Sequence, residues 1–167
     1  MGRSVEVTTA IAQFMRDLER VWDQHRDALL VRRDPAAAVA AIADEPSVTH
    51  IPALTGGTGR QAVERFYAGQ VLPYLPADLT LRRISRTVDR WRLVDETTVS
   101  FTHDCELPWL LPGAEPTFRR AEVLAIAVVG FDRTRIRSQR VLWDHATLAA
   151  QLGLGTATAP AATGPAR

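Results

Sequence analysis

The chain has 167 residues and a formal net charge of +1, because 20 basic residues are set against 19 acidic ones. Every basic residue is Arg, and the sequence contains neither Lys nor Asn. Without Lys there is no Schiff-base enzyme and no P-loop, and without Asn there is no N-glycosylation site. The small net charge gives no overall attraction to nucleic acid or to a membrane.

The length predicts one domain, which we place at residues 8–154. Residues 1–7 are expected to be flexible, and 155–167, rich in Ala, Thr, Gly and Pro, are expected to be disordered. The single cysteine, Cys105, cannot form an internal disulfide, which favours a cytoplasmic protein. No signal-peptide pattern and no apolar run of roughly 18 residues is present, so no membrane segment is predicted.

The first half of the chain has the periodicity of helices. Residues 8–33 carry apolar side chains at steps of three and four. Asp34 and Pro35 predict the start of a second helix over 35–43, as N-cap and first helical residue. Three further segments are predicted before residue 77, namely a short strand, a Gly-rich loop and a third helix: 47–51, 55–59 and 60–75.

The second half changes to strand patterns and ends in a short helix. The predicted strands are 79–88, 92–103, 118–131 and 135–143, and the helix is 145–152. Helices gathered on one face of a strongly curved antiparallel or mixed sheet make an α+β fold. We expect the sheet to curl into a cone whose wide side is closed by the three N-terminal helices, with a pocket inside.

Strand alternation assigns side chains to this pocket. In 92–103, one face carries aromatic and β-branched bulk and is assigned to the cone interior: Asp95, Thr97, Val99, Phe101 and His103. In the strand 135–143, Ile136, Ser138, Arg140 and Leu142 share one face, and the carboxylate at the strand end, Asp144, lies on the same face. His103 is then expected to be a polar group at the pocket mouth.

Several segments resemble the nuclear transport factor 2-like superfamily, and in particular its SnoaL-like, ketosteroid isomerase-like members: 42–50, 59–67, 94–103, 107–113, 141–144 and 150–153. The last four look like a SnoaL-like subgroup labelled carboxymethylenebutenolidase-like. The resemblance covers residues 8–154. It implies the cystatin-like α+β barrel fold and a reaction that varies among isomerases, cyclases, hydrolases, dehydratases and pure binders.

The resemblance also implies catalytic positions. His50 occupies the place of the general-base carboxylate of ketosteroid isomerases, and Asp144 lies near the acid of SnoaL-like cyclases. His50 as base, Asp144 as acid and His103 as an orienting donor are expected around one cavity. Alternatively, His50 packs with both nitrogens bonded, Asp144 caps the following helix, and His103 faces water.

The pocket wall is expected to be largely aromatic and apolar. The predicted wall residues are Trp22, Tyr67, Phe101, Trp109, Arg140, Leu142 and Trp143. The apolar loop 107–112 is expected to fold over the cavity mouth or over a partner subunit.

The leading functional hypothesis is a cofactor-independent acid–base enzyme, a cyclase or isomerase, that acts on a bulky apolar carbonyl intermediate in natural-product biosynthesis. The alternatives are a hydrolase or dehydratase that uses a pocket water, and a non-catalytic small-molecule-binding accessory protein. Limonene epoxide hydrolases of the superfamily arrange Asp-Arg-Asp around a water. Arg140 and Asp144 could supply part of this, and Asp95 is the one candidate for the second Asp.

No cofactor or metal is predicted, because the four His show no ligand spacing and His25 is expected to be solvated. Scattered arginines among acids argue against nucleic-acid binding. A homodimer is expected from the resemblance, through the outer face of the sheet that includes Thr98, Ser100 and Thr102.

Overall fold

The computed structural model describes residues 2–155, with side chains from residue 6 onward. The tail predicted to be disordered therefore lies, apart from Gly155, outside the described residues. The helices and short helical turns are α1 (Gly2–Leu30), α2 (Pro35–Ala40), α3 (Arg60–Phe66), a π-helical turn (Tyr67–Val71), a 3-10 turn (Leu72–Tyr74) and α4 (His145–Leu152). The strands are β1 (Ile42–Ile51), β2 (Thr55–Thr58), β3 (Thr80–Val88), β4 (Arg92–Thr102), β5 (Arg120–Asp132) and β6 (Arg135–Trp143).

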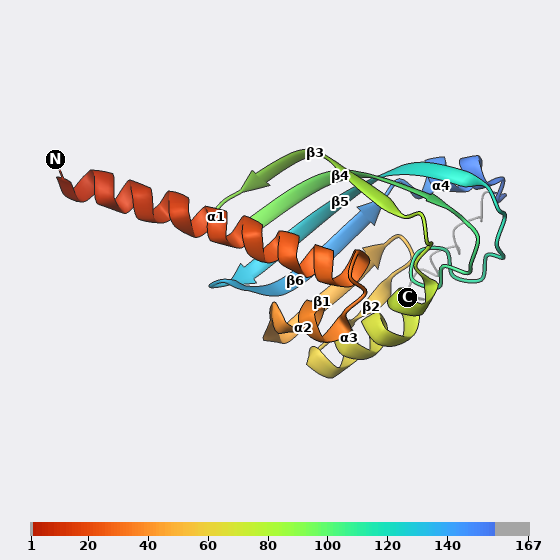
Figure 1. Cartoon of the computed structure of the whole chain (residues 1–167), viewed down its shortest axis with the longest axis horizontal. Helices are drawn as coiled ribbons and strands as arrows, with labels where there is room; N and C mark the ends of the chain where they lie inside the picture. The colour runs from red at the N-terminus through yellow and green to blue at the C-terminus, as the bar shows by residue number, and fades with distance from the viewer. Residues whose placement is uncertain (1, 156–167) are drawn as a thin grey trace, which may run out of the picture.

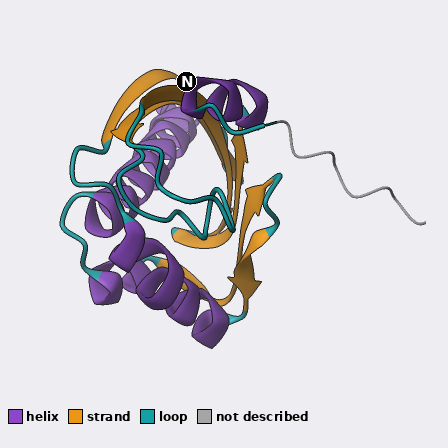
Figure 2. Cartoon of the chain, turned by 90° about the vertical axis from the view of Figure 1, so that its right-hand side faces the viewer, coloured by secondary structure: helices purple, strands orange, loops and turns teal. Residues whose placement is uncertain are grey.

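The six strands form one sheet in the order β2-β1-β6-β5-β4-β3. Neighbouring strands are antiparallel except β1 and β6, which pair in parallel. The sheet is strongly curled but not closed, and the N-terminal helices lie on its concave side (Figure 2). The predicted α+β class with a curved mixed sheet is confirmed.

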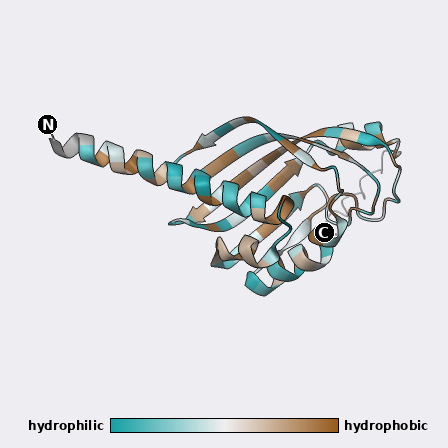
Figure 3. Ribbon diagram, viewed as in Figure 1, coloured by the Kyte–Doolittle hydropathy of each residue, from teal (hydrophilic) through white to brown (hydrophobic). Residues whose placement is uncertain are grey.

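The long helix α1 crosses the concave side of the sheet, and its N-terminal part projects beyond the sheet (Figure 1). The strands carry strongly hydrophobic segments along the central part of the sheet (Figure 3). The core gathers side chains from both halves of the chain, among them Leu18, Trp22, Phe66, Leu93, Val123 and Ile136. The concave side of the sheet is thus where a cavity between helix and strands can form.

Local sequence explains several element boundaries. The side chain of Asp34 accepts a hydrogen bond from the amide of Ala37 at 3.0 Å, and Pro35 follows as the first residue of α2. Gly153 ends α4 in the left-handed conformation, with φ of 69°. These were the predicted boundaries.

The structure differs from prediction at several places. α2 ends at Ala40 rather than at residue 43, and α3 ends at Phe66 rather than at residue 75. α1 begins at Gly2 rather than residue 8, so residues 2–7 are helical. β1 begins at Ile42 rather than residue 47, because a register shift lets the strand continue through Pro46. Thr55–Thr58, expected as a loop, pairs with β1 as β2, and a Cβ on Gly56 would meet the Val48 carbonyl oxygen.

Candidate functional site

A cavity of about 70 Å³ lies between α1 and the concave face of the sheet. Its wall is mainly apolar and includes Leu29, Val99, Ala125 and Val141. Polar side chains of six residues also reach the wall: His25, Arg26, His50, Asp95, Thr97 and Gln139. A mostly apolar space with a few polar groups is the usual form of a small-molecule site.

His50 is brought to this wall by β1, which pairs with β6 and so places His50 near Trp143. The indole N–H of Trp143 donates to His50 Nδ1 at 3.1 Å. The two rings are stacked with centroids 6.2 Å apart, and Trp109 meets the imidazole edge-on at 5.4 Å. Because Nδ1 accepts a hydrogen bond, the proton of the neutral ring is assigned to Nε2.

Burial lowers the pKa of His50 to about 4, so the ring is neutral at pH 7. A neutral imidazole that carries its proton on Nε2 offers a hydrogen-bond donor to the cavity. The resemblance had suggested that His50 acts as a general base. Because Trp143 already uses the lone pair of Nδ1, the other ring nitrogen, Nε2, carries a proton and can donate a hydrogen bond.

Asp95, from β4, is the carboxylate of the cavity wall and is only 1% exposed. Its Oδ2 accepts from Trp22 Nε1 at 2.8 Å, from Arg26 at 2.9 Å and from Arg86 at 3.0 Å. Its Oδ1 accepts from Arg86 Nε at 3.0 Å. Two guanidinium groups and an indole therefore hold the carboxylate in place and balance its charge.

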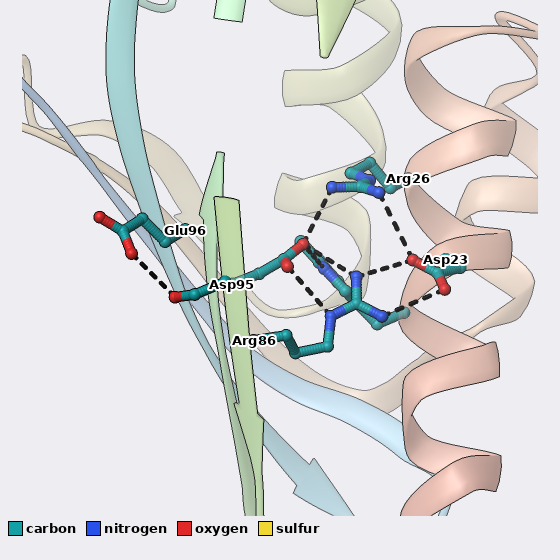
Figure 4. A network of polar contacts seen from close by, with 7 residues as sticks. Asp23, Arg26, Arg86, Asp95 and Glu96 are labelled. Carbon is teal, nitrogen blue, oxygen red and sulfur yellow. Dashed lines mark hydrogen bonds and ion pairs between the residues drawn. The ribbon is translucent and has the colours of Figure 1, made fainter. Parts of the chain in front are cut away.

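Asp23 extends these contacts to the surface of α1. It binds Arg86 at 2.7 Å and lies 3.4 Å from Arg26, as Figure 4 shows. Partial burial acts to raise the pKa of Asp23, but Arg86 outweighs it and lowers that pKa. Burial likewise opposes the charge of Arg86, yet its two carboxylate partners raise the pKa of the guanidinium. We call Asp23, Arg26, Arg86 and Asp95 the acid–arginine network.

His25 was expected to be solvated, and this expectation is wrong: the side chain is 1% exposed and lines the cavity. Its Nδ1 donates to the Ala38 carbonyl at 2.9 Å, and its Nε2 lies 3.4 Å from the Tyr67 hydroxyl. That hydroxyl also lies 3.3 Å from Gln139 Oε1. Burial lowers the pKa of His25, so it is a neutral, hydrogen-bonded member of the wall. The missed signal is its spacing from Trp22 and Leu29, which is that of a residue on the apolar stripe of α1.

Asp144 does not share the cavity with His50, which corrects the expected acid–base pair across one cavity. It is exposed, and its carboxylate accepts from the amide of Thr147 at 3.2 Å as the N-cap of α4. These bonds from Thr147 lower the pKa of Asp144, the direction opposite to that of a general acid at neutral pH. The capping alternative describes the observed geometry.

His103 is also outside the cavity wall, although it is buried. Its Nδ1 accepts from the Thr117 amide at 3.3 Å, and its backbone bonds Arg119 and Phe118 where the chain returns to the sheet. Burial lowers the pKa of His103. The expected role as an orienting donor beside His50 is therefore corrected to an anchor for the segment that leads into β5.

The face of β6 was assigned the wrong way round near its end. The register between β5 and β6 shifts at Gly130 and Phe131, so that Ile136 and Gln139 both point inward. After this bulge Val141 and Trp143 face the cavity, whereas Arg140 and Leu142, predicted in the pocket, are exposed. One extra residue in a strand reverses every side chain that follows.

The structure places three of the predicted wall residues, Trp22, Trp109 and Trp143, on the cavity wall. Tyr67 and Phe101 are buried but do not line the cavity, and the Tyr67 hydroxyl lies 3.3 Å from Oε1 of the wall residue Gln139. Trp109 belongs to the apolar loop 107–112 and is the residue of this loop that lines the cavity, and the Thr55 hydroxyl donates to the Trp109 carbonyl.

Among residues 2–155, no group of three or more His, Cys, Asp or Glu side chains is arranged to hold a metal ion. None of the helices in this range combines the length and the apolar character needed to cross a membrane.

Comparison with known proteins gives matches in structure but not in sequence. No family model matches the chain, and no curated protein matches it. A candidate SnoaL-like polyketide cyclase from Shewanella putrefaciens superimposes with a TM-score of 0.65 at 16% identity, over 82% of this chain and 86% of the other. The chain has the nuclear transport factor 2-like fold. This agrees with the resemblance seen in the sequence.

Two other solved structures show how widely this nuclear transport factor 2-like fold is used. An LEH-like epoxide hydrolase of Mycobacterium tuberculosis aligns with a TM-score of 0.62 at 14% identity, over 84% of this chain and 92% of the other. A protein with a ketosteroid isomerase-like fold from Catenulispora acidiphila, in complex with trimethylamine, aligns with a TM-score of 0.61 at 13% identity, over 80% and 92%. At such identities the likeness concerns the fold, and the reaction must be argued from the site.

Proposed function

We propose that the chain binds a neutral, mostly apolar carbonyl compound and polarises its carbonyl oxygen through His50 Nε2–H. The observation that carries this proposal is the hydrogen bond from Trp143 to His50 Nδ1, which leaves Nε2–H as a donor in an apolar cavity. Polarising a carbonyl is the first requirement of the cofactor-free isomerisation or ring closure that the sequence resemblance implies.

The neutral state of His50 suits this role. An imidazole with a pKa of about 4 donates a hydrogen bond at pH 7 without bringing a positive charge into the cavity. Asp95 is the carboxylate of the cavity wall, and its two oxygens already accept hydrogen bonds from four N–H groups. The neutral His50 and the hydrogen-bonded Asp95 carboxylate support a role in binding more strongly than a role in rapid proton abstraction.

The test compares 2-hexanone with 2-methyl-1-hexene, in which C=CH2 replaces C=O. His50→Leu removes the donor and should weaken ketone binding, relative to the alkene, by about three- to tenfold, the value of one net hydrogen bond. Dissociation constants are measured by NMR titration of the folded variants. His145→Leu, the same change outside the cavity wall, is the matched control and should leave both constants unchanged. Equal effects of His50→Leu on ketone and alkene would refute the donor role.

A second candidate, addition of water to an epoxide, is favoured by the Asp23–Arg86–Asp95 arrangement. Asp95 would take a proton from a water whose oxygen attacks an epoxide carbon, while His50 Nε2–H donates to the oxygen of the breaking C–O bond. With 1,2-epoxyhexane in heavy-oxygen water, this candidate requires a diol that carries one heavy oxygen and is lost in Asp95→Asn. Unlabelled or absent diol would exclude it.

A further inference from the structure

The cavity beside His50 lies next to a groove on the outside of the molecule. The groove has a volume of about 640 Å³ and runs between α1 and the start of β3. Three residues line both the groove and the cavity, namely Arg26, Leu79 and Leu81. The two spaces are therefore separated only by these three side chains, from α1 and from the segment that begins β3, and we call this place the junction.

The volumes of the two spaces imply that a larger ligand lies partly in the cavity and partly in the groove. Pockets that enclose a whole drug-sized ligand usually have volumes of about 300–1,000 Å³, and the cavity of about 70 Å³ is much smaller. A larger compound can place only one end beside His50. Its remaining part must leave through the junction into the groove.

The lining of the groove indicates what this remaining part is. Its apolar surface comes from Leu79, Leu81 and Val31. Its charged side chains are two carboxylates and two guanidinium groups, Asp23, Asp27, Arg26 and Arg83. Their formal charges cancel, and Asp23 is already paired with Arg26 and Arg86. An uncharged apolar chain fits this groove better than a charged group, which would compete with existing ion pairs.

Arg26 lies at the junction with both ends of its guanidinium engaged. One nitrogen donates to Asp95 in the cavity wall at 2.9 Å, and another lies 3.4 Å from Asp23 at the groove. The side chain is thereby held along the wall, and its methylene groups can form one side of the passage.

We propose that the groove between α1 and β3 binds the tail of the ligand whose carbonyl end lies at His50, and that the ligand class is an unbranched carbonyl compound with a long uncharged chain. This inference rests on the proposed function, since His50 fixes which end enters the cavity. It specifies a second subsite, with Leu79, Leu81 and Val31 as its chain-binding residues.

The experiment titrates a series of methyl ketones, 2-pentanone, 2-heptanone and 2-nonanone, against the full chain by NMR. Affinity should rise by about two- to fourfold for each added methylene that enters the groove. Val31→Glu should weaken 2-nonanone binding by about five- to tenfold and change 2-pentanone binding by less than about twofold, because only the longer chain reaches this position. Val31 is 67% exposed, so the substitution is compatible with folding.

Val7→Glu is the matched control, because Val7 lies on α1, the helix that ends just before Val31, is 56% exposed and does not line the groove. It should leave the whole series unchanged. A series that is flat with chain length, or equal effects of Val31→Glu and Val7→Glu, would overturn the subsite. If the series is flat but His50→Leu still discriminates ketone from alkene, the proposed function survives without it. Absence of binding by every ketone would overturn both.

Discussion

The charge of His50 is decided by its surroundings rather than by its residue type. Its side chain is enclosed by Phe66, Trp109 and Trp143, and none of these can balance a positive charge as a carboxylate would. A histidine that is neutral when folded and has an ordinary pKa when unfolded makes stability depend on pH.

The free energy of unfolding should therefore fall as the pH is lowered from 6.5 toward 4. The unfolded chain binds a proton at His50 below its ordinary pKa of about 6.5, whereas the folded protein does so only near the pKa of about 4. His50 alone contributes a slope of about 1.4 kcal/mol per pH unit over this window. Urea unfolding at several pH values measures it, and His25 and His103, with pKa values also lowered by burial, act in the same direction.

The difference between wild type and His50→Leu isolates the contribution of His50. The free energy of unfolding of wild type minus that of His50→Leu should decrease steadily as the pH falls from 6.5 to 4. It should stay constant above pH 7. A difference that does not change with pH would mean that His50 has the same pKa in the folded and unfolded chains.

Asp144→Ala should lower the free energy of unfolding, because it removes the N-cap of α4. The carboxylate accepts from the Thr147 amide at the start of α4 and does not line the cavity, so ketone affinity should be unchanged. Urea unfolding and NMR titration measure the two effects. A large loss of affinity with unchanged stability would restore Asp144 as a site residue.

For single residues, the sequence predicted which side chains face the cavity better than it predicted which partners they bind. The alternation of β4 correctly placed Asp95 and Val99 inward, because the strand is regular there. The partners of Asp95 could not be predicted, since Trp22 and Arg26 lie about seventy positions away in the sequence. The tautomer of His50 likewise depends on Trp143, at a separation of 93 residues.

At the scale of elements, the acid–arginine network joins α1 to β3 and β4. Arg86 is central to it, with a side chain 5% exposed that binds both Asp23 and Asp95. Removing one partner of a buried ion pair leaves the other charge without compensation, which costs more than removing both.

Arg86→Met should accordingly reduce the free energy of unfolding by about 3–5 kcal/mol. The double variant Arg86→Met/Asp95→Leu should regain much of this loss, because Arg26 can still pair with Asp23 and reach solvent. Urea unfolding of both variants tests the prediction. A single variant that loses less than about 1 kcal/mol, or a double variant no more stable than the single one, would contradict it.

The bulge in β6 shows why element-level prediction failed where it mattered. The boundaries of β6 were predicted correctly as 135–143, yet its inward face changes within the strand. Period-two alternation contains no signal for an inserted residue, because the bulge depends on how β5 and β1 pair with β6. Arg140 and Leu142 were therefore wrongly assigned to the cavity, whereas Val141, which was not predicted there, lines it beside Trp143.

At the scale of the whole molecule, ligand binding should raise the thermal stability of the fold. A ligand at about one hundred times its dissociation constant stabilises the folded state by about 2.7 kcal/mol. For a chain of this size that corresponds to an increase of roughly 5–10 °C in Tm, measured by circular dichroism or calorimetry. 2-Nonanone should give this increase in wild type, with a smaller one in Val31→Glu at the same concentration. Equal increases in the two proteins would contradict the proposed tail site.

Fold class was predictable because it follows from the order of helical and strand periodicities along the chain. The pairing partner of each strand was less predictable, because the parallel pairing of β1 with β6 brings together segments some ninety residues apart. The size of the cavity was not predictable, since it depends on how side chains distant in the sequence pack around it, such as Trp109 against Trp143 with their ring centroids 5.6 Å apart.

The β1–β6 pairing also determines when the site can exist during synthesis. Until β6 has left the ribosome, β1 has only β2 to pair with, His50 lacks its partner Trp143, and the inner wall lacks Gln139 and Val141. Early helices and hairpins can form locally, but the binding site is assembled only after nearly the whole described chain has been made. A ribosome-bound chain halted before residue 135 should therefore lack the ketone site altogether, however well its helices have formed.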